Sequence, residues 1–245
     1  MIFASTMVYA LGKELGFEGA EAEFHRQLGE PTNESLPCVR TIHRLRSLDS
    51  VGLRLDCNAV SIGQARSRAF HEAVESMADV WIAIDDDVEA DTATLKHLLE
   101  AVRGEPAICI APYTLREREA VVSVALEPGG KPRLLDTGGV VWPARGGGLG
   151  LCAVSRSALL RMSLAYASSL GFVDQDGVHR LAMFHELIRS NVWHGEDISF
   201  CERAREAGVR VEALGTGHVK HAGQTLQLDV VRPAPPTNGP AVSWP

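Results

Sequence analysis

The alternation of apolar and polar residues along this chain predicts strands separated by amphipathic helices. The clearest segment is residues 80–88, where an apolar run leads directly into Asp85, Asp86 and Asp87. An uninterrupted apolar run of this length is typical of a strand buried on both faces, as in parallel sheets. Because such a strand has no room for charge, we expect the three carboxylates just beyond its carboxyl end. Open α/β sheets bind their ligands at that edge.

The same pattern predicts a regular order of elements in the first half of the chain. Short apolar runs predict strands at residues 2–8, 51–55 and 107–111. Apolar residues at helical spacing predict helices over 41–48, from Ser61 to about Met77, and from about residue 91 to Gly104. Ser61 is the expected N-cap of the second of these helices, and Asp91 or Thr92 that of the third. Residues 12–37 are polar and are expected to be irregular. The alternation of strand and helix implies right-handed crossovers and a mostly parallel sheet.

After Pro112 the predicted elements become shorter. We expect a hairpin formed by 121–126 and 133–135 and a strand at 138–142. A glycine-rich stretch at 146–150 is followed by a further strand and then by a helix that begins at Ser155 or Ser157. We expect loops over 171–195, a helix at 198–207 and a strand at 209–214. From residue 224 onward prolines predict an extended or mobile tail. We therefore expect one α/β domain over residues 1–223 and a tail over 224–245.

Composition excludes several classes of protein. A net charge of −7 argues against a nucleic-acid-binding surface, which requires a basic stripe. The chain has no run of 18 apolar residues and no basic, apolar signal segment at its start, so no transmembrane segment is expected. Its five cysteines are scattered without a C-x-x-C pair, which favours reduced thiols in the cytoplasm.

The spacing of Asp85 and Asp87 indicates a metal site. Residues two apart on an extended backbone face the same way, so both carboxylates can address one ion while Asp86 points elsewhere. Adjacent acids repel one another unless a cation or hydrogen-bond donors compensate. Carboxylate oxygens suit Mg²⁺ or Mn²⁺, which keep positions open for water and substrate phosphates. The alternative is a solvated acidic turn that caps the next helix.

Two further pairs of residues are candidates for chemistry. Glu196 and Asp197 stand at the predicted start of a helix, where the dipole favours acids and capping explains one of them. A carboxylate at this place can also act as general base toward a hydroxyl. His218 and His221 follow the last strand among glycines. A histidine there would complete the shell of the ion and favour Mn²⁺, and a structural histidine is the alternative.

Three more residues are candidates for substrate contacts. Arg66 lies in the first turns of its helix, where the dipole favours anions. Trp193 adjoins the acid pair and is a candidate to stack on a sugar face, although most tryptophans are packing residues. Gly148 belongs to a stretch that formally matches a dinucleotide fingerprint but lacks the acidic residue that ends the following strand. A loop that shapes an acceptor pocket and an ordinary glycine-rich turn both remain open.

In their order along the chain, these residues resemble glycosyltransferases of the GT-A fold, in particular the large inverting family with D-x-D and E-D motifs. The resemblance covers about residues 50–223 and rests on Ala65-Arg66, Ile84-Asp85-Asp86-Asp87-Val88, the stretch 146–150 leading into Cys152-Ala153-Val154, the stretch 195–201 and Gly217-His218-Val219. It implies a Rossmann-like α/β/α sandwich with a mostly parallel central sheet. Its donor-binding half would cover about residues 1–111 and its acceptor-binding half 112–223.

The resemblance also implies roles for single residues. Asp85 would contact the nucleoside side of the donor, and Asp87 would bind Mn²⁺ or Mg²⁺. Asp197 would be the base for the acceptor hydroxyl, and Glu196 would help to position the acceptor. His218 matches the late metal-binding histidine of the family, with His221 as the fallback.

The resemblance also implies which residues contact the donor and the acceptor. Arg66 matches a donor-binding position, and Asp86 is grouped with it. In the family, the first strand leads into a nucleotide loop that contains proline, whereas Ser5 and Thr6 stand at that place here. Trp193 and Gly148 are the candidate acceptor contacts.

The function predicted on these grounds is metal-dependent transfer of a sugar from a UDP- or GDP-sugar to a hydroxyl of a sugar or another acceptor, with inversion. A nucleotidyltransferase could use the same acids, but we would expect a Gly-rich loop with Lys or Arg after its first strand. A non-catalytic nucleotide- or sugar-binding module and a structural partner domain are two further possibilities.

Overall fold

The computed structural model describes residues 1–7, 9–56, 61–115, 118–174, 177–221 and 224–229. Its centre is a nine-stranded sheet. The sheet consists of β1 (Ile2–Met7), β2 (Val51–Asp56), β3 (Val80–Asp85), β5 (Ala107–Ile110), β8 (Val124–Leu126), β9 (Arg133–Leu134), β10 (Val140–Gly147), β11 (Leu151–Ser155) and β16 (Arg210–Leu214). The strand order is β2-β1-β3-β11-β5-β16-β10-β8, and β9 pairs with β10.

Among the described residues, seven of these nine strands run in one direction, and only β10 and β11 run the opposite way. The prediction of a mostly parallel sheet is therefore confirmed. The antiparallel strand β11 lies between β3 and β5. Strands β3 and β5 are therefore not neighbours in the sheet, although they were predicted as consecutive buried strands along the chain. Strands from before and after residue 111 thus share one sheet.

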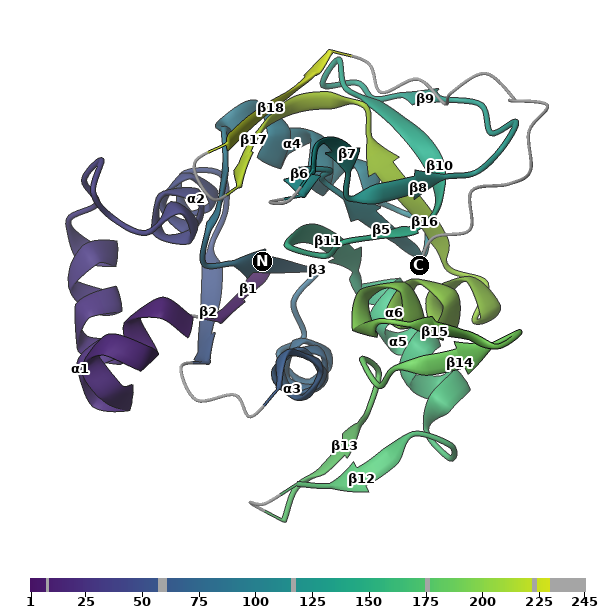
Figure 1. The fold of residues 1–245 in the computed structure, drawn as a ribbon, viewed down its shortest axis with the longest axis horizontal. Coiled ribbons are helices and arrows are strands. Elements are labelled where there is room, and N and C mark those ends of the chain that lie inside the picture. Colours follow the sequence, from purple (N-terminus) through teal and green to yellow (C-terminus); the bar gives the residue numbers. More distant parts are fainter. Residues whose placement is uncertain (8, 57–60, 116–117, 175–176, 222–223, 230–245) are drawn as a thin grey trace.

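Helices cover both faces of the sheet, as Figure 1 shows. The helices are α1 (Tyr9–Gly29), α2 (Pro37–Arg46), α3 (Ile62–Glu75), α4 (Thr92–Ala101), α5 (Arg156–Tyr166) and α6 (Glu196–Glu206). In β3, Ile82 and Ile84 join the apolar core under α2 and α4, whereas Trp81 and Ala83 join the core under α3, α5 and α6. The predicted α/β/α sandwich is confirmed. Helix α1 packs outside α2, as both ribbon views show.

The predicted helix boundaries follow from local hydrogen bonds. The hydroxyl of Ser61 accepts from the backbone N–H of Gln64 at 3.2 Å, and the carboxylate of Asp91 accepts from that of Thr94 at 2.7 Å. Ser155 caps α5 in the same way. Helix α6 is followed by Gly208, whose φ of 71° suits a residue without a side chain. These caps fix where α3, α4 and α5 begin and where α6 ends.

Two predictions of secondary structure are wrong, one in the first half of the chain and one in the second half. Most of the segment expected to be irregular, residues 12–37, belongs to α1 and to the start of α2. The burial of Ala20, Phe24 and Leu28 explains this, because these residues form one stripe at a spacing of four. The expected hairpin of 121–126 with 133–135 does not form either, since β8 and β9 both pair with β10.

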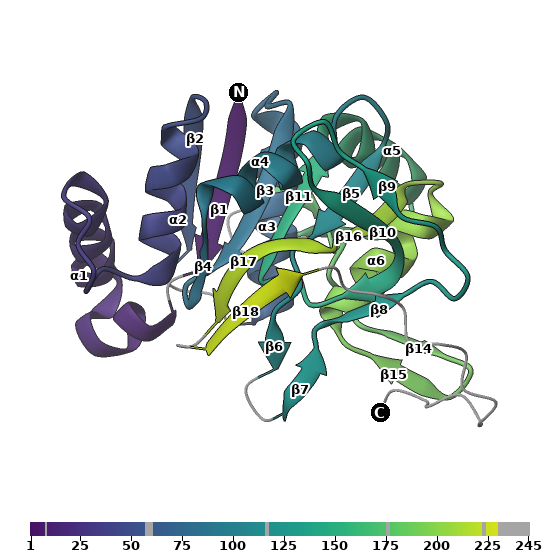
Figure 2. The ribbon, with the colours of Figure 1, turned by 90° about the horizontal axis from the view of Figure 1, so that it is seen from above.

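Short strands form four small sheets beside the main one. They are β4 (Val88–Ala90), β17 (Thr216–His221) and β18 (Gln224–Asp229) in one sheet, and the pairs β6 (Thr114–Leu115) with β7 (Arg118–Val122), β12 (Gly171–Val173) with β13 (His179–Leu181), and β14 (Leu187–Arg189) with β15 (Val192–His194). Figure 1 shows the β12–β13 pair extending away from the sandwich, and Figure 2 shows β17 between β18 and β4.

The segments predicted as loops and as a tail therefore contain strands. Residues 171–174 and 177–195 contain two pairs of antiparallel strands, and the first part of the expected tail pairs with β17 as β18. Residues 230–245, the rest of that tail, lie outside the described residues. No helix in the described part of the chain combines the length and the apolar character needed to cross a bilayer.

Candidate active site

A buried arginine connects the two acidic motifs. Arg66 lies on α3 and is 5% exposed. Its Nη2 donates to both carboxylate oxygens of Asp85, at 2.9 and 3.1 Å. Its Nη1 donates to Oδ1 of Asp197 and lies 3.5 Å from Oε1 of Glu196. One guanidinium therefore joins the end of β3 to the start of α6.

Burial and charge act in opposite directions within this group, which we call the Arg66 cluster (Arg66, Asp85, Glu196 and Asp197). Burial alone would lower the pKa of Arg66, but the surrounding carboxylates raise it. Burial raises the pKa of Asp197 to about 6, and the nearby charges of Glu196 and Asp85 act in the same direction. Arg66 and the N–H of Leu149 oppose this increase. The carboxyl group of Asp197 thus titrates close to neutral pH.

The hydrogen bonds of Asp197 differ from those of a helix cap. Gly195 is the N-cap residue of α6, and no side chain in the described structure caps this helix. The Oδ2 atom of Asp197 instead accepts from the backbone N–H of Leu149 at 3.1 Å, in the loop after β10. Both oxygens are therefore oriented by groups outside α6. Since a carboxylate has about four acceptor positions, Asp197 retains capacity for a further hydrogen bond.

The glycine-rich stretch brings β11 against the same carboxylates. The backbone N–H of Asp85 donates to the carbonyl of Gly150 at 2.7 Å. A Cβ atom at Gly150 would lie 3.0 Å from Oδ2 of Asp85 and 3.0 Å from the Tyr113 ring. A Cβ at Gly148 would collide with the hydroxyl of Tyr113. Close packing thus accounts for both glycines, and an acceptor-binding role for Gly148 stays a prediction.

His221 lies beside the third aspartate. Its Nε2 is 3.4 Å from Oδ2 of Asp87, and its Nδ1 is 3.0 Å from the backbone carbonyl of Thr114. Since a carbonyl can only accept, Nδ1 must carry the hydrogen. In this tautomer of the neutral imidazole, Nε2 carries the lone pair that a metal ion could bind, beside Oδ2 of Asp87.

The position of His218 differs from that of His221. It is exposed, and it lies on the face of β17 opposite to that of Val219 and His221, because its side chain and theirs emerge from different sides of the strand. Its backbone is bound to the hydroxyl of Thr94 on α4, with an N···O distance of 2.8 Å. Of the two predicted histidines, His221 is therefore the one that lies beside Asp87, and metal binding by either histidine stays a prediction.

Of the remaining donor-binding candidates, Ser5 and Thr6 are buried and Asp86 is partly buried. Ser5 and Thr6 are 6% and 2% exposed, and the hydroxyl of Ser5 accepts from the indole N–H of Trp81 at 2.9 Å. Together with Arg66 and Asp85 they line a crevice of only about 10 Å³. The carbonyl of Asp86 accepts from the backbone N–H of Cys38 on α2. Donor binding by Ser5, Thr6 and Asp86 stays a prediction.

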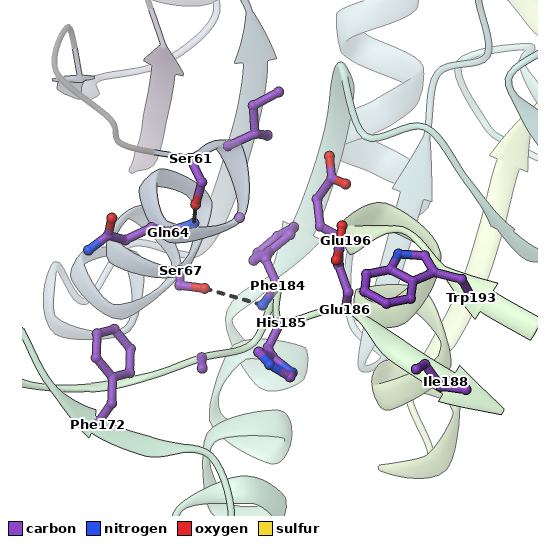
Figure 3. A pocket seen from close by; sticks show the side chains of 13 residues that line it. Ser61, Gln64, Ser67, Phe172, Phe184, His185, Glu186, Ile188, Trp193 and Glu196 are labelled. Atoms are coloured by element: carbon purple, nitrogen blue, oxygen red, sulfur yellow. Dashed lines mark hydrogen bonds between the residues drawn. The ribbon is translucent and has the colours of Figure 1, made fainter.

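A cavity of about 650 Å³ opens beside Glu196, between α3 and the two hairpins that precede α6. Figure 3 shows its walls, with Phe172 on one side and Trp193 and Ile188 on the other. Trp193 is 61% exposed and lines this cavity, and acceptor binding by Trp193 stays a prediction. No pattern in the sequence pointed to Phe172, Phe184 or Ile188, because all three belong to the stretch that was predicted as loops.

Comparison with known proteins assigns the chain to no family. No family model matches it, and a search of curated proteins gives no match. Among solved structures, A197 from STIV aligns over 96% of this chain and 99% of its own length, with 12% identity and a TM-score of 0.47. The inositol-1-phosphate CTP transferase from T. maritima aligns over 93% and 89%, with 12% identity and a TM-score of 0.38.

A third similar structure is 4-diphosphocytidyl-2C-methyl-D-erythritol synthase from Anaerococcus prevotii. It aligns over 84% of this chain and 96% of its own length, with 12% identity and a TM-score of 0.33. At these values none of the three structures bears on what this chain binds or catalyses. The chemistry of the site rests on its own residues.

Proposed function

We propose that this protein transfers a sugar from a nucleoside diphosphate sugar to an acceptor hydroxyl. The observation that supports the proposal best is the Arg66 cluster. It joins a strand-end aspartate, Asp85, to a carboxylate with a pKa of about 6, Asp197, at the ligand-binding edge of the sheet. A cavity large enough for a sugar opens beside it.

Asp87 and His221 are the residues that would hold a divalent metal. Among the described residues no group of three or more His, Cys, Asp or Glu side chains could hold a metal ion. One carboxylate and one imidazole nevertheless fit Mn²⁺ or Mg²⁺, which commonly take only one or two protein ligands and complete their shell with water and substrate phosphates. When bound, the ion would offset the charge of the donor's diphosphate and make it a better leaving group.

The chain's own side chains have separable roles in this proposal. Asp197 takes the proton of the acceptor hydroxyl as that oxygen attacks the anomeric carbon, and its pKa of about 6 leaves it ionised at neutral pH. Arg66 fixes the orientation of Asp197 and Asp85, since it donates to both carboxylates. Glu196 borders the cavity and positions the acceptor. The buried, free cysteines of the described residues fit a cytoplasmic setting, which is part of the proposal.

Product analysis separates this function from its alternatives. The protein is incubated with Mn²⁺ and either UDP- or GDP-sugars, or with nucleoside triphosphates and sugar phosphates. Release of UDP or GDP is expected, whereas release of pyrophosphate would identify a nucleotidyltransferase. The Asp197→Asn variant should bind donor but not transfer, and Asp136→Asn, at an exposed position outside the site, should behave as wild type. Binding of nucleotide without turnover by the wild type would identify a binding module.

A further inference from the structure

The cavity beside Glu196 has one apolar wall built by paired residues. Ile188 and Trp193 are cross-strand neighbours in the β14–β15 hairpin, so their side chains lie on the same face. Both line the cavity although they are 67% and 61% exposed. Phe172, on the β12–β13 hairpin, lines the cavity from the other side (Figure 3). These side chains offer a flat aromatic face and an aliphatic edge to a ligand.

The polar residues around the cavity are mostly neutral or acidic. Ser61 and Gln64 come from the start of α3, His185 and Glu186 precede the β14–β15 hairpin, and Glu196 follows it. No lysine or arginine is among the lining residues in the described part of the chain. Arg66, on the same helix as Gln64, is committed to its three carboxylates. An anion in this cavity would therefore face two glutamates and the imidazole of His185, without a lysine or arginine to pair with.

We propose that this cavity binds the acceptor and that the acceptor is an uncharged glycoside. The inference rests on the proposed function and adds the class of acceptor to it. A neutral sugar ring has an apolar C–H face that stacks on an indole and hydroxyls that bond to carboxylates and amides. Removing an anionic group from water without a counter-charge is costly, so phosphorylated acceptors and uronic acids are selected against. The volume of about 650 Å³ is within the usual range of small-molecule sites.

A second cavity provides a matched control position. It has a volume of about 570 Å³, lies on the other side of Trp193 and is lined by Arg145 and Arg205. Val192 lines this second cavity but not the first, and Ile188 lines the first but not the second. Both residues are exposed positions of the same hairpin, at 39% and 67%. A positive charge introduced at each position therefore probes one cavity at a time.

The experiment compares matched acceptors that differ mainly in charge. The probes are para-nitrophenyl glucoside, its 6-phosphate and the corresponding glucuronide, tested for binding by ligand-observed NMR and for transfer by mass spectrometry, with a donor that the enzyme hydrolyses. We expect the neutral glucoside to be preferred over both anions by at least about tenfold. Ile188→Arg should reduce this preference by about tenfold or more, and Val192→Arg should leave it unchanged.

The outcomes distinguish this inference from the proposed function. If the enzyme hydrolyses the donor but binds or uses the anionic probes as well as the neutral one, or binds none of them, the acceptor class is wrong and the function stands. If both arginine variants change the preference equally, the effect is long-range charge and the cavity is not the acceptor site. If no nucleoside diphosphate sugar is bound or turned over, the proposed function itself fails.

Discussion

Replacing Arg66 by methionine should destabilise the protein in a pH-dependent way. The substitution keeps an apolar side chain of similar length but leaves the carboxylates of Asp85, Glu196 and Asp197 without their shared cation. Breaking a buried ion pair by removing one partner typically costs about 3 to 5 kcal/mol. We expect a loss of this size at pH 8, because Asp197 carries more negative charge at pH 8 than at pH 5.

The dependence on pH follows from the pKa of Asp197. Burial already raises this pKa from 3.8 to about 6 in the folded protein, so ionisation of Asp197 lowers stability as the pH increases through that range. A neighbouring arginine commonly lowers the pKa of an aspartate by about 1 to 3, so its removal should raise the pKa further. In the folded variant, the ionisation of Asp197 then continues to lower stability up to a higher pH than in the wild type. The loss of stability should be at least about 1.4 kcal/mol greater at pH 8 than at pH 5.

Urea unfolding of wild type and variant at pH 5 and pH 8 measures this difference directly. The matched control is Arg68→Met, because Arg68 is a half-buried arginine on the same helix that forms no ion pair among the described residues. Its effect should be smaller and independent of pH. An Arg66→Met variant that loses the same free energy of unfolding at both pH values would show that the three carboxylates are not held by this guanidinium.

Four further outcomes are expected from the same geometry. Turnover should fall about tenfold for each pH unit below about 6, because only ionised Asp197 accepts a proton; a rate that stays flat down to pH 5 would contradict this. Glu196→Gln should raise KM for the acceptor while the affinity for donor, measured by calorimetry, stays constant; a change in donor affinity would place Glu196 elsewhere. Gly150→Ala should lower the free energy of unfolding by about 1 to 3 kcal/mol, as urea titration will show, since its Cβ would lie 3.0 Å from Asp85; no loss would mean that the loop shifts freely. His218→Ala should leave Mn²⁺-dependent nucleotide binding unchanged, as calorimetry will show; a weaker affinity for the nucleotide would indicate that His218 is a metal ligand.

The sandwich could be predicted from the sequence because its strongest signals are local. The apolar run before Asp85 and the capping residues Ser61 and Asp91 each act within a few residues, and the structure shows the strand and both caps. The order of the strands was less predictable. Strand β11 enters antiparallel between β3 and β5, and nothing in its own residues specifies that partner. Helix α1 was missed because its buried stripe depends on packing against α2.

The acidic residues of the candidate site were expected from the sequence, but the ion pairs that join them were not. Asp85, Glu196 and Asp197 were singled out from their positions at element ends, and Arg66 was expected to bind the donor. The hydrogen bonds that join Arg66 to these carboxylates were not foreseen. The ion pairs of Arg66 with Glu196 and Asp197 join segments far apart in the sequence, so no local pattern could reveal them. The choice between His218 and His221 depended on the register of β17 against β4, which sets the face that each residue occupies.

The account depends most on the claim that Asp87 and His221 bind a metal that holds the donor's diphosphate. Calorimetric titration of UDP and GDP into the protein, with and without Mn²⁺, tests this claim directly when wild type and His221→Ala are compared. The account predicts that one of the two nucleotides binds, that binding requires Mn²⁺, and that His221→Ala weakens it by about tenfold or more. Binding that is equally tight without Mn²⁺, or unchanged in His221→Ala, would contradict it.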